Sequence, residues 1–500
     1  MDFVLTNAEM RSADEYTIKT LGVASTELME RAGLALADLA AELAPSGKVL
    51  CVCGGGNNGG DGFVCARILK ERSRAVETVC FADKLSDDCA KNRARWLALG
   101  GEILTEVPNE QYALVVDCLF GTGLRGGLDG KNAEAVNKIN ALRSTGAKVL
   151  SADIPSGLCG DNGLAPGAAV CADVTLCIGE KKAGALLQDG LDLAGEVRRA
   201  DIGIVLPSRG YATVADQEAV RAVLPKRKRN SHKGSYGKAA IVGGSLEYTG
   251  APYLAAAGCL RSGAGYTTLY VPKSLLQSYV LALPEILLRP VCDGERFAFE
   301  TENLRELLGY DAVAYGTGMG VSEAVALGAE FLLREYTGKL VLDADGLNSL
   351  AKYKTSEFSK LFSEKKCDVL LTPHVKEYAR LTGKTVDEIL QDGVYATREF
   401  CSKYQINVLL KNASSVLSDG DKTVLIAAGC SGQAKGGSGD ALLGVIAGLC
   451  ASGASAFDGG LLGAELVGKA AELAATEIGE YSLTASDVIA YLGRAFSDYS

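Results

Sequence analysis

The chain has 500 residues, of which 48% are hydrophobic and 22% are charged, and its formal net charge is −10. This composition is typical of a globular protein with about two to four domains, and the negative charge argues against bulk binding of nucleic acid. No apolar run approaches the ~20 residues that a membrane span needs. The first residues lack a basic stretch followed by an apolar one, so we expect no signal peptide and no membrane partner.

The use of cysteine and histidine narrows the possible chemistry. The 15 cysteines stand among apolar neighbours and form no CxxC pair, which is typical of reduced thiols in a cytoplasmic protein. His232 and His374 are the two histidines of the chain, so a zinc site built from histidine is nearly excluded.

Short apolar runs alternate with helical patterns along the chain, which predicts α/β layers around mostly parallel sheets. The first strand is expected at 48–53, and the helix that follows it at 61–72. Further strands are expected at 114–116, 149–152, 239–242, 312–315, 339–342, 369–371 and 406–410.

The alternation is interrupted near 205–238, where Pro207, Pro225 and the basic run Lys226–Arg229 (KRKR) occur. We place a domain boundary close to 210–225 and divide the chain into domains 1–215 and 216–500. The basic run is interpreted as a solvated segment or a rim that attracts an anionic ligand, and a nuclear-localisation signal is the alternative.

Three predicted strands of the first half are followed directly by polar or glycine-rich residues. Gly54–Asp61 (GGGNNGGD) follows the first strand, Asp117–Gly127 (DCLFGTGLRGG) the second and Asp153–Gly157 (DIPSG) the third. Ligands of open parallel sheets bind beyond the carboxyl ends of the strands, so we expect these segments to form one site.

A phosphate-binding role explains the glycines. A glycine-rich loop that runs into a helix exposes backbone N–H groups, and the helix N-terminus favours negative charge. Arg125 would add a cation in the second segment. The alternative is a set of tight turns with ordinary capping side chains.

Asn58, Asp117 and Ser156 offer hard oxygen ligands at these strand ends. Such ligands suit alkali or alkaline-earth cations, and their spacing does not choose between them.

On these segments, together with Leu28–Gly33 (LMERAG), roughly the first 210 residues resemble the NAD(P)H-hydrate epimerase family. The resemblance implies a Rossmann-like doubly wound sheet and a potassium ion bound by Asn58, Asp117 and Ser156. It also implies that the hydrated dinucleotide is bound by Asn57, Asn58, Gly59, Gly60, Asp61, Gly121, Thr122, Gly123, Leu124, Arg125, Gly126, Gly127 and Asp153. The family's Lys-Pro-Gly segment is Lys182-Ala-Gly184 here, which keeps the lysine and loses the proline.

Inversion at C6 of a hydrated nicotinamide ring needs a positioned acid/base, whether the hydroxyl leaves and returns or the ring opens. Asp153, at a strand end, is our candidate for this catalytic role. Asp61 is the rival, although the start of a helix is also an ordinary place for a capping aspartate.

The most informative segment of the second half is Gly436–Leu449 (GGSGDALLGVIAGL). Glycines at a helix N-terminus form an anion hole for developing phosphate charge, and Asp440 is placed to accept a proton from an attacking hydroxyl. The helix dipole would keep Asp440 ionised. A capped core helix is the alternative. Other segments after predicted strands are Tyr315–Gly320, Leu342–Asn348, Thr372–Glu377 and Lys411–Ser415, in which Asp343 and Asp345 are either caps or site residues.

Roughly residues 220–500 resemble the ribokinase-like fold and, more closely, the ADP/ATP-dependent NAD(P)H-hydrate dehydratases. The segments that carry the resemblance are 232–238 (HKGSYGK), 243–245 (GGS), 249–251 (TGA), 260–265 (LRSGAG) and 436–440. It implies that Ala251, Gly318, His374 and Asp440 contact the hydrated dinucleotide, with Asp440 as catalytic base. It implies that Lys411, Asn412, Ala413, Ser414, Ser415 and Gly439 contact ADP or ATP, which is used with Mg²⁺. Val375 and Lys376 depart from the Pro-Gly of many bacterial members.

Together the two resemblances predict a bifunctional enzyme that repairs hydrated NAD(P)H. One half would epimerise the R and S forms at C6, and the other would dehydrate the S form with ADP or ATP. The alternative is a small-molecule kinase of ribokinase-like type with a non-catalytic nucleotide-binding module. We expect a cytoplasmic homo-oligomer whose partners are the hydrated dinucleotides and an adenine nucleotide.

Overall fold

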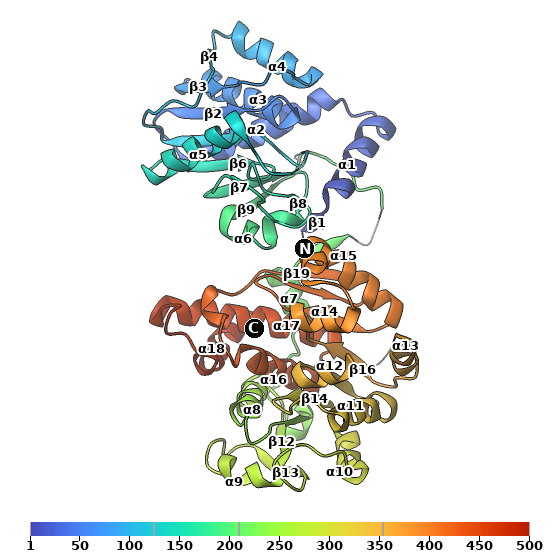
Figure 1. The fold of residues 1–500 in the computed structure, drawn as a ribbon. Helices are drawn as coiled ribbons and strands as arrows, with labels where there is room; N and C mark the ends of the chain where they lie inside the picture. Colours follow the sequence, from blue (N-terminus) through green and yellow to red (C-terminus); the bar gives the residue numbers. More distant parts are fainter. Residues whose placement is uncertain (1, 124–125, 209–210, 353–354, 500) are drawn as a thin grey trace. The chain divides into compact units, whose positions relative to one another are not determined.

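A computed structural model of the chain describes residues 2–123, 126–208, 211–352 and 355–499. The chain divides into two compact units, Asp2–Ala212 and Thr213–Ser500, which we call the first unit and the second unit (Figure 1). Each unit has its own buried hydrophobic core. Among the described helices we find none with the length and apolar character of a membrane span.

The first unit is built on a parallel sheet with the strand order β4-β3-β2-β5-β6-β7-β9. Its strands are β2 (Val49–Cys53), β3 (Val76–Val79), β4 (Ile103–Leu104), β5 (Leu114–Cys118), β6 (Lys148–Ala152), β7 (Val174–Ile178) and β9 (Glu196–Ala200). The strand order reverses between β2 and β5. Open parallel sheets bind ligands at such a reversal, beyond the carboxyl ends of the strands.

Side chains of β2 alternate between two cores. Cys51 packs in a cluster with residues of α2 and α3, whereas Leu50 packs in another with residues of α5. Burial on both faces explains why these strands are uninterrupted apolar runs, and each fully buried aliphatic side chain contributes about 1.5–3 kcal/mol. The helices of the unit are α1 (Asn7–Glu15), α2 (Ser25–Leu43), α3 (Asn57–Glu71), α4 (Asp87–Ala98), α5 (Gly130–Ser144) and α6 (Gly190–Leu193), with a π-helical turn at Tyr16–Thr20 and a 3-10 turn at Ala183–Leu186.

A short strand pair places α1. Strand β1 (Phe3–Leu5) pairs in parallel with β8 (Lys181–Lys182), and Leu5 lies opposite Lys182. Helix α1 begins directly after β1, where the Thr6 hydroxyl accepts a hydrogen bond from the Glu9 backbone N–H and the Glu9 carboxylate accepts one from that of Thr6. The pairing therefore fixes α1 relative to Lys182.

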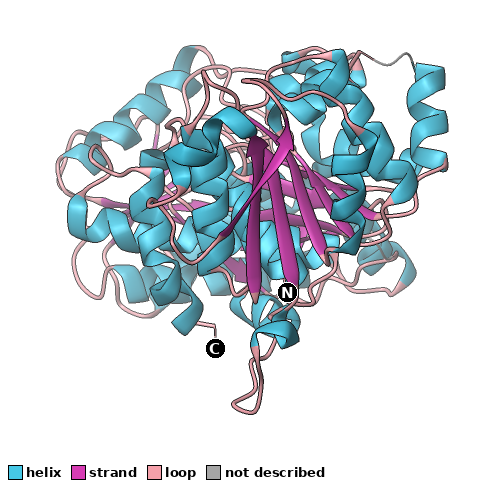
Figure 2. Ribbon diagram, turned by 90° about the horizontal axis from the view of Figure 1, so that it is seen from below, coloured by secondary structure: helices cyan, strands magenta, loops and turns pink. Residues whose placement is uncertain are grey.

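The sheet of the second unit runs in the order β13-β12-β11-β14-β15-β16-β17-β18-β19-β10. Neighbouring strands are parallel except where β18 pairs with β17 and with β19. Figure 2 shows strands side by side with helices on both sides. The strands are β10 (Ala212–Val214), β11 (Lys238–Gly243), β12 (Tyr266–Pro272), β13 (Leu287–Cys292), β14 (Ala312–Thr317), β15 (Lys339–Leu342), β16 (Asp368–Leu371), β17 (Asn407–Leu410), β18 (Ser415–Ser418) and β19 (Thr423–Ile426).

The helices of the second unit include a tightly packed central pair, α8 and α16. A Cβ at Gly444 would lie 1.8 Å from the Ala255 carbonyl oxygen, so the small residues of α16 serve this contact. The helices are α7 (Gln217–Val223), α8 (Gly250–Arg261), α9 (Leu276–Tyr279), α10 (Thr301–Arg305), α11 (Glu323–Glu335), α12 (Ala344–Leu350), α13 (Thr355–Ser363), α14 (Val375–Thr382), α15 (Val386–Tyr404), α16 (Ser438–Ala451), α17 (Ala456–Ile478) and α18 (Ala485–Ser497). Short 3-10 turns lie at Lys233–Tyr236, Lys273–Leu275, Glu306–Gly309 and Ser431–Gln433.

The predicted α/β class and the predicted strands are confirmed, with small differences at their ends. Strand β5 continues beyond Val116 because Asp117 and Cys118 still pair with the neighbouring strands. The helix expected at 61–72 begins earlier, at Asn57, and ends at Glu71. All 15 cysteines are free thiols.

Candidate active sites

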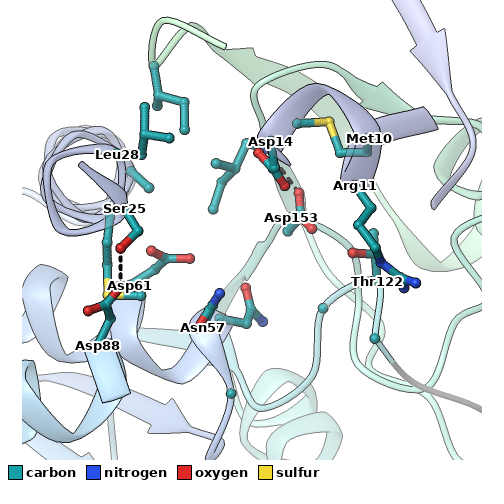
Figure 3. A pocket seen from close by; sticks show the side chains of 18 of the residues that line it. Met10, Arg11, Asp14, Ser25, Leu28, Asn57, Asp61, Asp88, Thr122 and Asp153 are labelled. Carbon is teal, nitrogen blue, oxygen red and sulfur yellow. Dashed lines mark hydrogen bonds between the residues drawn. The ribbon is translucent and has the colours of Figure 1, made fainter. Parts of the chain in front are cut away.

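A cavity of about 620 Å³ lies at the strand-order reversal of the first unit (Figure 3). The segments that follow β2, β5 and β6 form part of its wall, and the rest comes from α1, the π-helical turn, α2, Asp88 of α4, Ile178, Lys182 and Ile202. The structure therefore brings the three strand ends together around one cavity. Of the predicted dinucleotide-binding residues, it is lined by Asn57, Asn58, Asp61, Gly121, Thr122, Gly123 and Asp153.

The segment predicted as a glycine-rich loop is largely helical. Gly54–Gly56 make the turn, and Asn57–Asp61 form the first turn of α3. A Cβ at Gly59 would lie 1.9 Å from the Gly54 carbonyl oxygen, and one at Gly60 would lie 2.6 Å from Met29 Sδ. These glycines let the helix start pack closely, and they leave its free N–H groups beside the cavity.

Gly126 and Gly127 of the second glycine segment do not line the cavity. Gly127 packs toward Pro166, since a Cβ there would lie 3.4 Å from the Pro166 carbonyl oxygen, and Gly126 has a positive φ of +78°. Leu124 and Arg125, also predicted to bind the dinucleotide, lie outside the described residues.

Asp117 is the centre of a hydrogen-bond network that joins the ends of β5 and β6. Its buried carboxylate accepts hydrogen bonds from the Ser151 hydroxyl (2.9 Å), the Ser156 hydroxyl (2.7 Å) and the Ser156 backbone N–H (2.9 Å). The Ser156 hydroxyl also accepts from the Phe120 N–H at 2.8 Å. Burial raises the pKa of Asp117, and the hydrogen bonds act against that increase.

Asn58 differs from Asp117 and Ser156 because its amide group is buried without a hydrogen-bond partner among the described residues. A buried polar group without a partner is destabilising by about 1–3 kcal/mol, so it points to a ligand. Among the described residues no group of three or more His, Cys, Asp or Glu side chains is placed to hold a metal ion. The amide, hydroxyl and carboxylate oxygens of the three residues fit a cation that prefers oxygen ligands, such as potassium.

Asp153 is held in an unusual backbone conformation at the end of β6. Its φ of +70° lies in the left-handed region, which non-glycine residues seldom adopt. Its N–H donates to the Leu176 carbonyl at 2.8 Å, and its Oδ1 accepts from the Ile178 N–H at 3.2 Å. Conformations of this kind are unfavourable by about 1–3 kcal/mol and cluster at functional sites.

Lys182, the lysine of the Lys-Ala-Gly segment, is a site residue for which the sequence predicts no role. Its side chain is 1% exposed, forms an ion pair with Asp153 and donates to the Ile178 carbonyl at 2.5 Å. Burial alone would lower the pKa of this ammonium group, but the negative charge of Asp153 raises it above the usual value. Asp153 therefore has a stable cationic partner.

Two of the other carboxyl groups at the same cavity, Asp61 and Asp14, have raised pKa values. Asp61 is 8% exposed, and its carboxyl group lines the cavity. Burial raises the pKa of Asp61 well above its usual value, and the charges of Asp153 and Asp14 raise it further. Burial raises the pKa of Asp14 to about 6, against the effect of Lys182. Figure 3 shows Asp61 on one side of the cavity and Asp14 with Asp153 on the other.

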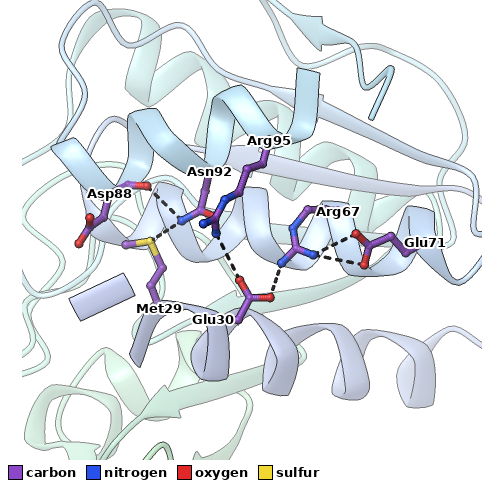
Figure 4. Close-up of polar contacts among 7 residues, drawn as sticks. All are labelled: Met29, Glu30, Arg67, Glu71, Asp88, Asn92 and Arg95. Carbon is purple, nitrogen blue, oxygen red and sulfur yellow. Dashed lines mark hydrogen bonds and ion pairs between the residues drawn. The ribbon is translucent and has the colours of Figure 1, made fainter. Parts of the chain in front are cut away.

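A polar network holds the helices around the cavity in place. Ser25 donates to the cavity residue Asp88 at 2.6 Å, and Asn92 donates to Met29 Sδ at 3.1 Å. Arg67 pairs with Glu30 and, at 3.0 Å, with Glu71. These contacts join α2 to α3 and α2 to α4. Figure 4 shows the seven residues Met29, Glu30, Arg67, Glu71, Asp88, Asn92 and Arg95.

The second unit places Asp440 beside the end of β14. Helix α16 begins at Ser438 after Gly437, whose φ of +97° favours glycine, and Asp440 accepts a hydrogen bond from the Thr317 hydroxyl. We expected the helix dipole to keep Asp440 ionised. In the structure, burial raises the pKa of Asp440, and the Thr317 hydrogen bond acts against the increase.

Lys411 forms an ion pair at the same edge. Its Nζ lies 2.7 Å from Asp343 Oδ1, and the Asp343 side chain is 4% exposed. A Cβ at Gly439 would lie 3.5 Å from Lys411 Nζ, so the predicted nucleotide residues Lys411 and Gly439 are neighbours. Asp343 stands at the N-cap of α12 but makes no capping hydrogen bond, and the Asp345 carboxylate accepts a hydrogen bond from the distant Gly320 N–H at 2.8 Å.

His374 caps a helix as well as standing at a strand end. Its Nδ1 accepts from the backbone N–H groups of Lys376 (3.1 Å) and Glu377 (3.4 Å) at the start of α14. Burial lowers the pKa of His374, and the charge of Lys411 lowers it further. The imidazole is therefore held neutral, with Nδ1 as an acceptor.

The other predicted binding residues of the second unit include both buried and exposed side chains. Gly318, with φ of +62°, lies against Ala251, since a Cβ at Gly318 would be 3.1 Å from that of Ala251. The buried Ser414 hydroxyl donates to the Ile426 carbonyl at 3.3 Å, and Ser415 begins β18. The neighbouring residues Asn412 and Ala413 are exposed.

Residues 25–184 match the family described as the YjeF-related protein N-terminus, and residues 239–494 match the NAD(P)H-hydrate dehydratase family. A bifunctional NAD(P)H-hydrate repair enzyme from Thermofilum pendens is 35% identical over 510 aligned positions, which cover 98% of this chain and 95% of that protein. This chain belongs to the bifunctional NAD(P)H-hydrate repair enzymes. A repair enzyme from Moorella thermoacetica is 33% identical over 98% of this chain and 96% of its own length.

A solved structure shares the fold of the second unit. The ADP/ATP-dependent NAD(P)H-hydrate dehydratase from Bacillus subtilis, co-crystallised with ATP and Mg²⁺, is 29% identical with a TM-score of 0.50. The match covers 58% of this chain and 99% of that chain. The repair-enzyme family predicted from the motifs is confirmed, and the alternative of a small-molecule kinase with a non-catalytic module is not favoured.

Proposed function

We propose that the first unit of this repair enzyme epimerises hydrated NAD(P)H at C6 and that the second unit dehydrates the S form with ADP or ATP. The cavity in which Asp61 faces the Asp153–Lys182 ion pair supports the first activity. The Thr317–Asp440 and Lys411–Asp343 pairs, which meet at one edge of the sheet around Gly439, support the second.

The epimerisation uses two carboxyl groups on opposite sides of the ring. The C6–O bond breaks with its electron pair on oxygen, the neutral Asp61 protonates the leaving hydroxide to water, and the ring nitrogen forms a C=N bond to C6. Water then adds to the opposite face and gives its proton to Asp153, while the C=N electrons return to nitrogen. Lys182 pairs with Asp153 at the position where the base is needed, and burial raises the pKa of Asp61, which favours its protonated form as the acid.

The dehydration uses Asp440 as the base. Asp440 accepts the proton of the C6 hydroxyl, whose oxygen attacks the terminal phosphoryl group of the nucleotide and displaces AMP or ADP. The ring nitrogen then expels inorganic phosphate from C6, and loss of a ring proton restores NAD(P)H. The free N–H groups at the start of α16 and the Lys411 ammonium group would hold the phosphates.

We assign two cations to these sites. Potassium would be held by Asn58, Asp117 and Ser156 and would bring positive charge to the wall where the pyrophosphate binds. Mg²⁺ would arrive with the nucleotide and neutralise charge on its phosphates. The free thiols support a reducing compartment such as the cytoplasm, and a homo-oligomeric state stays a prediction.

The decisive experiment uses the full chain with hydrated NADH and potassium, and follows both epimers by chiral separation. Without nucleotide, the purified R form should equilibrate with the S form. Addition of Mg²⁺ with ADP or ATP should then consume both, with phosphate release and recovery of NADH absorbance. A stable phosphorylated product would identify a kinase instead, and a nucleotide requirement for epimerisation would contradict the assignment of one reaction to each unit.

Replacement of Asn58 by alanine should weaken potassium binding, because it removes one oxygen ligand of the site. In the unchanged chain, potassium should raise the unfolding temperature of the first unit more than sodium does, and Asn58→Ala should reduce this difference. Trp96, the one tryptophan of the chain, is buried in this unit, so its fluorescence reports the unfolding. Equal responses to the two ions in the unchanged chain would refute the potassium site. Asn57→Ala, which removes a neighbouring amide, is the control.

A further inference from the structure

Each turnover of the proposed epimerisation changes the protonation of two carboxyl groups. In one direction Asp61 loses a proton and Asp153 gains one. When the dehydratase removes the S form, the net flow runs in one direction, so the two carboxyl groups must be reset between turnovers. The Asp153 side chain is 15% exposed and faces the cavity, whereas its partner Lys182 is 1% exposed and offers no path to solvent, so the route from Asp153 to water runs through the cavity.

Asp14 is a carboxyl group that nothing in this scheme uses. It comes from α1, lines the cavity and lies beside Asp153 (Figure 3). It is half-buried, and the exposed residues Arg11, Glu15 and Lys19 of the same helical segment line the outer part of the wall. A π-helical turn, Tyr16–Thr20, follows α1 directly, and such turns occur often at functional sites.

We propose that Asp14 relays the proton between Asp153 and water at the mouth of the cavity. This inference rests on the proposed epimerase function. The Asp14 carboxylate takes the proton from the Asp153 carboxyl, directly or through one water molecule, and releases it to solvent, from which Asp61 regains one. Bonds and charges balance, because one proton leaves the site and one enters it in each cycle.

The charges around Asp14 suit this role. Lys182 attracts it, Asp153 and Asp61 repel it, and Arg11, Glu15 and Lys19 stand at the cavity wall. Burial is the largest effect and raises its pKa to about 6. A group with a pKa near the working pH both accepts and releases a proton readily, whereas an ordinary aspartate holds one poorly.

The test measures net conversion of purified R form to S form by the full chain without nucleotide, after subtraction of the uncatalysed rate. The small buffer MES is varied at constant ionic strength near pH 6.5. In dilute buffer, Asp14→Asn should be about 10–100-fold slower than the unchanged chain, and concentrated buffer should restore much of the rate. Asp14→Glu should remain fast and independent of buffer concentration. Asp38→Asn, at an exposed α2 carboxylate paired with Arg72, is the matched control and should behave like the unchanged chain.

Three outcomes separate the possibilities. A full rate in Asp14→Asn would overturn the relay, and so would a slow rate that buffer does not restore in a chain whose Trp96 fluorescence is native, because Asp14 would then serve structure alone. If Asp14→Asn does not fold, a buffer-dependent Asp14→Glu would overturn the relay. If the unchanged chain does not interconvert the epimers at all, the proposed function itself fails.

Discussion

Replacement of Asp440 by asparagine is expected to slow nucleotide-dependent dehydration by about 10²–10⁴-fold, the usual contribution of a positioned general base. Asparagine keeps the size of the side chain and an oxygen that accepts the Thr317 hydrogen bond, but it is a far weaker base. Nucleotide binding should persist, because Lys411 and the start of α16 are unchanged. The measurement is the recovery of NADH from the S form with ADP and with ATP, together with release of phosphate.

The pH profile gives an independent test of Asp440. Burial raises its pKa, and a base must be ionised, so the dehydration rate of the unchanged chain should fall as pH drops through that raised value. Asp293→Asn is the control, since this aspartate is 84% exposed and paired with Lys273. A dehydration rate for Asp440→Asn close to that of the control would remove Asp440 from the reaction, and epimerisation should be the same in both variants.

Replacement of Asp153 by asparagine is expected to lower the epimerisation rate by about 10²–10⁴-fold while dehydration of the S form continues. The change removes the acid/base and leaves the buried Lys182 without its ion-pair partner. Breaking a buried pair on one side is destabilising by about 3–5 kcal/mol, so the first unit should also unfold more easily. Chiral separation gives the rate, and Trp96 fluorescence in urea gives the stability.

The double variant Asp153→Asn with Lys182→Met separates these two effects. Removal of both charges should recover much of the free energy of unfolding, because no unpaired buried charge remains. The epimerisation rate should stay low. If activity returned together with stability, the ion pair would have a structural role only, and Asp61 would be the better candidate for the acid/base.

The strands of the first unit could be predicted because their residues form short, uninterrupted apolar runs. The segment KVLCVC is apolar at each of the positions that form β2, and both faces of that strand are buried, so the strand and its polar carboxyl end were recognisable. The start of α3 was misplaced because glycine has a poor helix propensity. Gly59 and Gly60 are nevertheless part of the helix. A side chain at Gly59 would collide with the Gly54 backbone, and one at Gly60 would collide with Met29, so close packing requires glycine here despite its poor helix propensity.

Asp153 and Asp61 were candidates from the sequence, whereas Asp14 and the burial of Lys182 were not. Asp14 stands in an ordinary amphipathic helix, far from any strand end or glycine segment, and reaches the cavity because β1 pairs with β8. Lys182 follows β7, but a single lysine in a sequence is normally exposed, and its burial depends on Asp153. Burial raises the pKa of Asp14, and the charge of Asp153 raises that of Lys182 against the effect of burial, and neither tertiary effect has a local sequence signal.

The pairing of β1 with β8 also has a consequence for synthesis of the protein on the ribosome. The two strands are about 175 residues apart, so at about 5–20 residues per second β1 waits roughly 10–35 s for its partner. During that time α1, and with it Asp14, has no fixed position, and the edge of β1 is open to pairing with other chains. The epimerase pocket is therefore completed late, when Lys182 emerges, and a nascent chain that stalls before that point carries the glycine segments without a working site.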